Sequence, residues 1–172
     1  MPKQLNDIEV WKRLKGGDRK AFEQVYRSEI QVLIAYGRKY SKDLELVEDC
    51  VHDLFIYIWK QRESLSDTDS IRRYLLVAMR HRVLASKNKR KKVELKEPDE
   101  HSFQQESSIE ERITLKEQNE ENAFIVSESL QVLSSRQREA IYLRYMNEMS
   151  YEDICEIMKI NYQSVRNLIS TG

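Results

Sequence analysis

Glycine and proline are scarce in this sequence, which has 4 Gly and 2 Pro in 172 residues. The tight turns of sheet proteins and the loops that bind phosphate depend on glycine, so a sheet-rich fold and a nucleotide-binding enzyme are both disfavoured. The chain is 34% charged and 40% hydrophobic, a balance that suits long solvated helices around a modest core. Its length suits one domain or two small ones.

Cysteines and long apolar runs are also rare. Cys50 and Cys155 lie far apart without CxxC spacing, which excludes a disulfide framework and a zinc site. We expect each to be a small core residue of an apolar helix. The N-terminus has no apolar signal core, and no stretch approaches the ~18 apolar residues of a membrane span. The sequence therefore predicts a cytoplasmic protein without membrane insertion.

Charge is balanced overall but unevenly distributed. From Arg72 to Lys92 there are nine Lys or Arg and no Asp or Glu, whereas Glu94 to Glu121 holds ten Asp or Glu and three Lys or Arg. The basic block is a candidate nucleic-acid footprint. The alternative is a merely solvated helix face, which is the more common meaning of a charge run.

The first half of the chain has helical periodicity throughout. Residues 7–14 form a first helix that Asn6 or Asp7 can cap, and Lys15-Gly16-Gly17 ends it. Three more helices are predicted at about 18–40, 41–62 and 71–88. We expect the last of these to place these residues on its apolar face: Ile71, Tyr74, Leu75, Ala78, Leu84 and Ala85.

The predicted helix at 41–62 has more apolar surface than one packed face needs. Its stripe consists of Leu44, Val47, Val51, Leu54, Phe55 and Ile58. Ile56 and Trp59 widen this stripe, and acidic residues lie beside them. Such a surface favours a docking face for a partner, although a helix that is contacted on two sides within its own domain would look the same.

The chain then changes character. Residues 93–108 have no period, contain Pro98 and are acidic, which predicts a flexible linker. It separates residues 1–92 from residues 109–172. In the second part we expect a helix that begins near Ile109, a helix from Arg136 to Met146 capped by Ser134, and two short helices at the end.

Those two short helices have helix-turn-helix spacing. Ser150 caps the first, Ile154, Ile157 and Met158 point inward, and a turn at residues 159–161 leads to a helix that begins at Tyr162. Cys155 supplies a small residue where the two helices meet. The outward face of the last helix carries Gln163, Arg166, Asn167 and Ser170. Side chains of this kind form paired hydrogen bonds with base edges, although an ordinary helical hairpin has the same spacing.

Several stretches resemble the extracytoplasmic-function (ECF) subfamily of bacterial RNA polymerase sigma factors. In the second half these are LSSRQREA (133–140) and MSYEDICEIM (149–158), and in the first half GDRKAFEQVY (17–26) and VEDCVHDLFIYIWK (47–60). The resemblance implies an all-α protein of two small helical domains that directs core RNA polymerase to promoters, performs no catalysis and needs no cofactor. It also implies an anti-sigma factor as a third partner beside core polymerase and promoter DNA.

The resemblance implies three sets of site residues. Core polymerase would be bound by Glu48, Asp49, His52, Asp53, Ile56 and Trp59. The −10 element would be recognised and melted by Arg72, Arg73, Tyr74, Arg80, His81, Arg82, Lys87, Lys89 and Arg90. The −35 element would be read by Tyr162, Gln163, Ser164, Arg166, Asn167 and Ser170. We expect Arg72→Ala with Arg73→Ala to weaken promoter opening, and Trp59→Ala or Asp53→Ala to weaken core binding.

The sequence departs from the family pattern at several positions. The family usually has Trp at the position of Tyr74, Asn at that of His81, and often Gly at that of Lys159. The recognition helix of family members also continues for several turns, so we expect that the C-terminal domain is truncated at Gly172 and that its −35 binding is weak.

Two other functions are compatible with parts of the sequence. His52-Asp53 with Glu48 is a pattern of metal-dependent phosphohydrolases, but a metal site needs several converging ligands and the other histidines, His81 and His101, lie elsewhere. No metal is therefore expected. A helix-turn-helix transcription regulator without polymerase contact is the second alternative, and it would have no need of a docking helix at 47–60.

Overall fold

The computed structural model describes residues 2–94 and 132–171, and every regular element within these ranges is helical. The chain divides into two compact units, Met1–Pro98 and Asp99–Gly172. The all-α prediction is confirmed. Most of the predicted linker, and the predicted helix that begins near Ile109, lie outside the described residues. Within the described ranges, no helix combines the length and the apolar character needed to cross a membrane.

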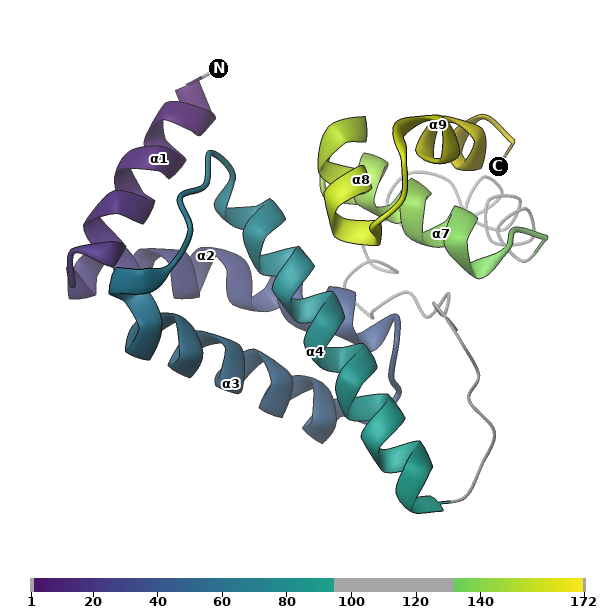
Figure 1. The fold of residues 1–172 in the computed structure, drawn as a ribbon, viewed down its shortest axis with the longest axis horizontal. Helices are drawn as coiled ribbons and strands as arrows, with labels where there is room; N and C mark the ends of the chain where they lie inside the picture. Colours follow the sequence, from purple (N-terminus) through teal and green to yellow (C-terminus); the bar gives the residue numbers. More distant parts are fainter. Residues whose placement is uncertain (1, 95–131, 172) are drawn as a thin grey trace, which may run out of the picture. The chain divides into compact units, whose positions relative to one another are not determined.

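The first unit consists of four helices (Figure 1). They are α1 (Pro2–Lys15), α2 (Arg19–Arg38), α3 (Leu44–Gln61) and α4 (Ile71–Glu94), and the 3₁₀ turn Arg62–Ser64 follows α3. Helices α2, α3 and α4 contact one another, and α1 packs mainly on α2. Burial of apolar side chains from all four helices drives this assembly. The largest fully buried ones include Trp11, Leu33, Tyr36, Leu54, Ile58, Leu75 and Met79.

Gly37 is the point of closest approach in this unit. A Cβ atom at this position would lie 2.7 Å from Val47 Cγ1 on α3 and 2.7 Å from Met79 Cε on α4. Both distances are below a normal van der Waals contact, so only glycine lets the three helices meet here without displacing a neighbour.

Some helix ends agree with the predictions and others differ: α3 begins at Leu44 and not at residue 41, and α4 continues to Glu94 and not to about residue 88. Gly17 ends α1 with a φ of 86°, and the carboxylate of Asp18 accepts hydrogen bonds from the N–H groups of Lys20 and Ala21. The prediction that α1 begins at residue 7 is wrong, because the helix starts at Pro2. Asp7 instead caps a different helix: its Oδ2 accepts a hydrogen bond of 3.1 Å from the N–H of Ile71 in α4.

The predicted apolar face of α4 is partly wrong. Ile71 and Leu75 are buried, but the buried line continues through Leu76, Met79 and Val83, whereas Ala85 is exposed. Apolar residues lie on both sides of this helix, so periodicity alone does not fix its rotation. The contacts of α4 with α2 and α3 select its rotation. The residues that fill the groove between these two helices follow one another at steps of four: Ile71, Leu75, Met79 and Val83.

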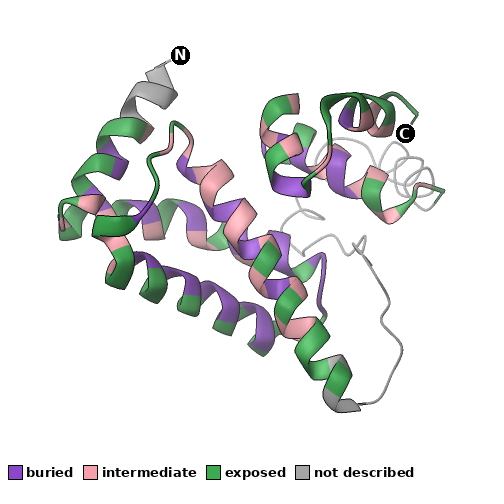
Figure 2. Cartoon of the chain, in the orientation of Figure 1, coloured by how far each residue is buried: buried purple, intermediate pink, exposed green. Residues whose placement is uncertain are grey.

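The second unit is described from residue 132 to residue 171. Its elements are α7 (Ser135–Ile141), the π-helical turn η2 (Tyr142–Met146), α8 (Tyr151–Met158) and α9 (Tyr162–Ser170). The predicted caps Ser134 and Ser150 are confirmed, and each forms a reciprocal capping box, with Gln137 and Asp153 respectively. Ile154, Ile157 and Met158 are buried as expected, and Val165 of α9 joins them. Figure 2 shows this burial pattern.

Candidate functional site

The predicted polymerase-docking residues lie on the outward face of α3. Glu48, Asp49, His52 and Asp53 are exposed, and Ile56 is 51% exposed even though it is a large apolar side chain. The opposite face of α3 is buried, as Figure 2 shows. An exposed isoleucine among carboxylates is available to a partner that is both apolar and basic.

Trp59 is the exception in this set, because it is half-buried. Its ring lies 5.0 Å from the ring of Phe22 in α2, and the guanidinium of Arg62 lies 4.8 Å from its centroid. A stacked indole with a cation on its face contributes to the stability of the unit itself. Trp59 therefore packs α3 against α2, on the side away from the exposed residues.

The alternative of a metal site on α3 gains no support. No group of three or more His, Cys, Asp or Glu side chains within the described ranges is arranged to hold a metal ion. His52 and Asp53 are exposed on a helix face, where solvated side chains are the ordinary case.

The first arginines of α4 are engaged within the protein. Arg72 donates to both carboxylate oxygens of Glu29 in α2, at 2.9 and 3.1 Å, and the exposed fractions of the two side chains are only 25% and 10%. Arg73 pairs with Asp69 at 2.5 Å. Arg80 donates to the hydroxyl of the buried Tyr40 at 3.2 Å. These contacts fasten α4 to α2 and to the loop before it.

Tyr74 is packed against α1. Its ring centroid lies 4.8 Å from that of the buried Trp11. Burial raises the pKa of the Tyr74 hydroxyl above 10.0, and the nearby Tyr57 acts in the same direction. Tyr74 is half-buried, so only part of its ring is available to a nucleic-acid base.

The outward surface of α4 lies farther along the helix. His81 and Lys89 are exposed and Arg82 and Lys87 are half-buried, while Arg90 pairs with Asp43, the cap of α3. The guanidinium of Arg82 lies 5.2 Å from the ring centroid of Tyr57 in α3, and Tyr57 is 47% exposed. Tyr57 was missed by sequence analysis. Its position in the sequence could have identified it, because Tyr57 follows the predicted docking residue Ile56 and lies outside the apolar stripe of α3.

A hollow of about 410 Å³ joins the two candidate surfaces of the first unit. It lies between α3 and α4, and its lining includes Asp49 and Asp53 on one side and Lys89 and Arg90 on the other. Acidic residues of the docking face thus lie close to the basic end of α4, and charges of opposite sign in such proximity attract.

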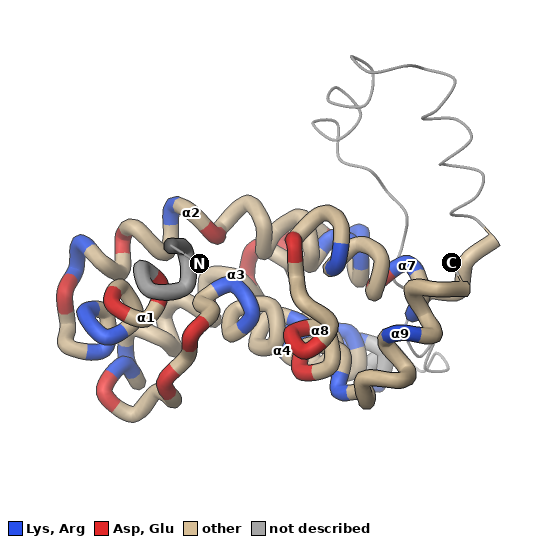
Figure 3. Tube along the Cα trace, turned by 90° about the horizontal axis from the view of Figure 1, so that it is seen from above, with Lys and Arg blue, Asp and Glu red and all other residues tan. Residues whose placement is uncertain are grey.

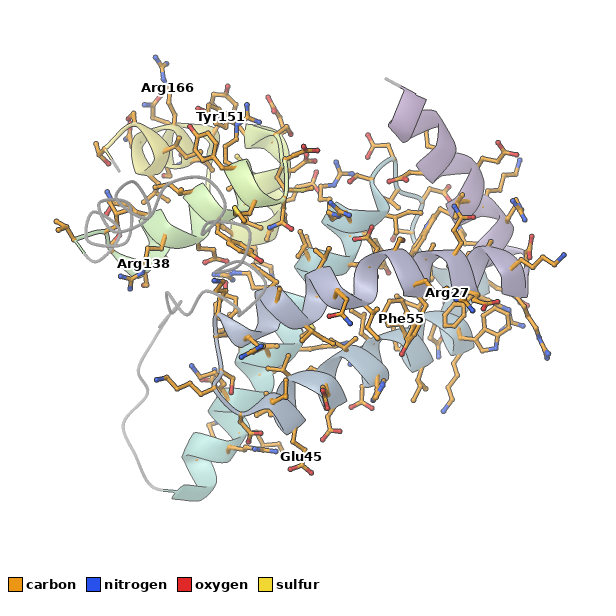
Figure 4. All side chains as sticks on the ribbon, turned by 180° about the vertical axis from the view of Figure 1, so that it is seen from behind. Arg27, Glu45, Phe55, Arg138, Tyr151 and Arg166 are labelled. Carbon is orange, nitrogen blue, oxygen red and sulfur yellow. The ribbon has the colours of Figure 1, made fainter. Side chains whose placement is uncertain are left out.

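In the second unit, α9 presents its polar side chains to solvent. Tyr162, Gln163, Arg166, Asn167 and Ser170 are exposed, and Ser164 is half-buried. Gln163 donates to Asn167 of the same helix at 2.9 Å. Arg166 projects away from its unit (Figure 4) and has no partner among the described residues. The prediction that Gln163, Arg166, Asn167 and Ser170 point outward from α9 is therefore confirmed by their exposure.

The turn between α8 and α9 contains a strained residue. Lys159 ends α8 in the left-handed conformation, with φ of 54°, which agrees with the expectation from its glycine-like position. Asn161 then caps α9 by accepting from the N–H of Ser164. Cys155 is half-buried, and burial raises the pKa of its thiol.

Charge is distributed differently in α8 and α9. Glu152, Asp153 and Glu156 lie on α8, whereas the charge of α9 is that of Arg166, as Figure 3 shows. A duplex repels the acidic helix and attracts the other. This difference favours α9 as the element that approaches nucleic acid.

Comparisons with known proteins match the two halves of the chain to two regions of one protein family. A family model described as Sigma-70 region 2 matches residues 25–93, and one described as Sigma-70, region 4 matches residues 123–172. Among solved structures, CnrH in complex with the cytosolic domain of CnrY has 18% sequence identity and a TM-score of 0.63, covering 96% of this chain and 90% of that chain. The sigma factor RpoE of Bartonella quintana, in complex with the anti-sigma factor NepR, has 20% identity and a TM-score of 0.61, covering 88% and 91% respectively. At these identities the likeness shows a shared fold. No curated protein matches the sequence significantly.

Proposed function

We propose that this chain, which belongs to the sigma-70 family, is an ECF-type sigma factor of transcription initiation. Its two units divide the work. Residues 1–92 bind core polymerase and recognise and melt the −10 element. Residues 109–172 read the −35 element, and residues 93–108 link the two. The protein performs no catalysis of its own, and its place is the cytoplasm, where polymerase and promoters are.

The polymerase contact is assigned to the outward face of α3. Its acids Glu48, Asp49 and Asp53 are exposed, as is Ile56, a combination that gives a partner both charge steering and apolar burial. Trp59 contributes indirectly by holding this part of α3 against Phe22. A regulator that does not bind polymerase would not need this surface, and the region 2 match covers it.

The −10 contact is assigned to the outward part of α4. His81, Arg82 and Lys89 lie along the accessible side, and Arg82 stacks on the exposed Tyr57. Single-stranded bases bind to cationic grooves that offer aromatic or guanidinium surfaces for stacking. Arg72, Arg73 and Arg80 act differently, since their ion pairs and hydrogen bonds hold α4 in place.

The −35 contact is assigned to α9, and its exposed polar face is the observation that carries the proposal. Arg166 and Asn167 lie on this face, and the buried Val165 anchors the helix to the unit. An arginine in the major groove pairs with guanine O6 and N7, and an asparagine pairs with adenine N6 and N7. The base contacts of such a helix come mainly from its N-terminal residues.

An anti-sigma factor is the third proposed partner. CnrH was solved with the cytosolic domain of CnrY, and RpoE with the anti-sigma factor NepR. By analogy we assign an anti-sigma partner to this chain. The exposed apolar side chain of Ile56, on the proposed docking face, gives such a protein a site at which it would compete with polymerase.

Reconstituted transcription tests the proposal. Core polymerase with this chain is expected to initiate at discrete sites in a library of genomic fragments, and core polymerase alone is not. Asp53→Lys should abolish co-purification with core polymerase, and Arg166→Ala should retain it while losing dependence on the −35 sequence. Lys20→Ala, on the exposed side of α2, is the matched control. Failure of the wild-type chain to bind core polymerase would refute the assignment.

A further inference from the structure

A column of stacked side chains runs through the second unit to the start of α9. The guanidinium of Arg144, in η2, lies 5.3 Å from the ring centroid of Tyr151. The ring of Tyr151, the first residue of α8, lies 5.7 Å from that of Tyr162 at an interplanar angle of 66°. This edge-to-face geometry is an attractive arrangement of two aromatic rings. One contact thus joins the first residues of both helices of the helix-turn-helix.

The two ends of the column have different surroundings. At one end, Arg144 also donates a hydrogen bond of 2.9 Å to the carbonyl of Met149, which fixes the guanidinium to the turn before α8. At the other end, Tyr162 is 47% exposed. The half-buried Tyr151 lies between an anchored cation and a ring that reaches solvent. The column is therefore fixed to the unit at one end and reaches solvent at the other.

Helix α9 needs such an anchor at its beginning. It spans only Tyr162–Ser170, and Val165 is its one fully buried residue. The turn before it contains Lys159 in the left-handed conformation, which costs free energy for a residue with a Cβ atom. The cap by Asn161 satisfies one backbone N–H of the first turn, and the contact between Tyr151 and Tyr162 adds a side-chain contact to the same turn.

We propose that Tyr151 is a positioning residue for promoter recognition, which acts by holding the ring of Tyr162 in one orientation at the base-reading end of α9. The inference rests on the proposed role of α9 as the −35 reader. A ring at the first position of a recognition helix lies where base edges are contacted, and its apolar edge complements the methyl group of thymine. Fixing this ring makes one base position of the −35 element selective.

Selection of promoters with a randomised −35 element by the holoenzyme tests this proposal. Tyr151→Leu should relax the base preference at one position about three- to tenfold, the range expected for loss of an aromatic pair. Preferences read by Arg166 and Asn167 should persist. Tyr151→Phe keeps the ring and should select the wild-type sequence. A uniform loss of preference at all positions, or a phenylalanine variant that behaves like the leucine variant, would overturn the assignment.

Tyr162→Leu provides a second route that does not depend on the half-buried site. It removes an exposed ring, so the fold is retained, and it should relax the same base position as Tyr151→Leu. The double variant should be no worse than either single one, because Tyr151 acts through Tyr162. Additive losses would contradict the proposal. Arg166→Ala tests the proposed role of α9 separately. If this variant selects the same −35 sequences as the wild type, α9 does not read the −35 element.

Discussion

Helices α4 and α9 were both predicted to meet DNA, and they differ in how their polar side chains are used. In α4, Arg72, Arg73 and Arg80 bind carboxylates or a buried hydroxyl of their own unit. In α9, Arg166 and Asn167 are exposed and the partner of Asn167 is on the same helix. A dense basic block therefore does not by itself mark a DNA-binding surface. Intramolecular partners decide how much of it remains available.

The largest expected effect comes from Arg72, and it concerns stability. Arg72→Ala leaves the carboxylate of Glu29, only 10% exposed, without its partner. We expect the free energy of unfolding of the first unit to fall by about 3 kcal/mol, since breaking a buried ion pair on one side costs about 3–5 kcal/mol. Urea unfolding followed by circular dichroism measures this.

A double variant sharpens the result. Glu29→Leu with Arg72→Met replaces the pair by apolar groups and should recover most of the lost stability, because no buried charge then remains unpaired. If Arg72→Ala unfolds like the wild type and instead abolishes promoter melting, Arg72 is a DNA contact and the contrast drawn above is incorrect.

Arg166 should show the opposite behaviour. Arg166→Ala is expected to weaken holoenzyme binding to a −35 duplex by about 1–3 kcal/mol, the usual cost of losing an arginine that reads a base. Stability should not change, because Arg166 has no partner among the described residues. Competition binding with matched and mismatched −35 sequences gives the measurement, and thermal unfolding gives the control. Lower stability without loss of selectivity would argue against base reading.

A smaller effect is expected where α4 does face solvent. Tyr57→Ala removes the ring on which Arg82 stacks, and we expect promoter opening to fall about fivefold, near the lower bound for one lost base-stacking contact. Permanganate reactivity of unpaired thymines in the −10 element reports opening directly. Core binding serves as the control; a variant that opens promoters normally but binds core polymerase poorly would place Tyr57 on the docking face.

The smallest expected effect concerns the cap that α1 provides for α4. Asp7→Ala leaves the N–H of Ile71 without the acceptor at 3.1 Å and should lower the stability of the first unit by about 1 kcal/mol. Asp7→Asn, which retains an acceptor oxygen, should cost less. Equal losses for both substitutions would indicate that the charge of Asp7, more than its hydrogen bond, stabilises α4.

Local features of this protein were predictable from the sequence. The caps Ser134 and Ser150 and the outward face of α9 depend on residues within a few positions of one another, so periodicity and cap chemistry identify them. Contacts across long sequence separations were not. Glu29 and Arg72 are 43 residues apart, and Asp7 and Ile71 are 64 apart. Only packing of the helices brings them together.

The rotation of α4 illustrates why such contacts escape prediction. Leu84 and Ala85 look as apolar in the sequence as Leu76 and Val83, yet Val83 is buried and Ala85 is exposed. If α4 were rotated so that Ala85 and not Val83 was buried, different arginines would point to the neighbouring helices. Arg72, Arg73 and Arg80 contact residues of their own unit, and the assignment of the −10 residues to DNA stays a prediction.

Site-specific photocrosslinking in a promoter complex tests the division of labour most directly. A photoreactive residue in place of His81 is predicted to crosslink to the non-template strand of the −10 element, and one in place of Arg166 to the −35 duplex. A probe at the exposed Lys20 of α2 should give neither product. If both probes crosslink to the same element, or if Arg166 reacts only with protein, the assignment of one DNA element to each unit is contradicted.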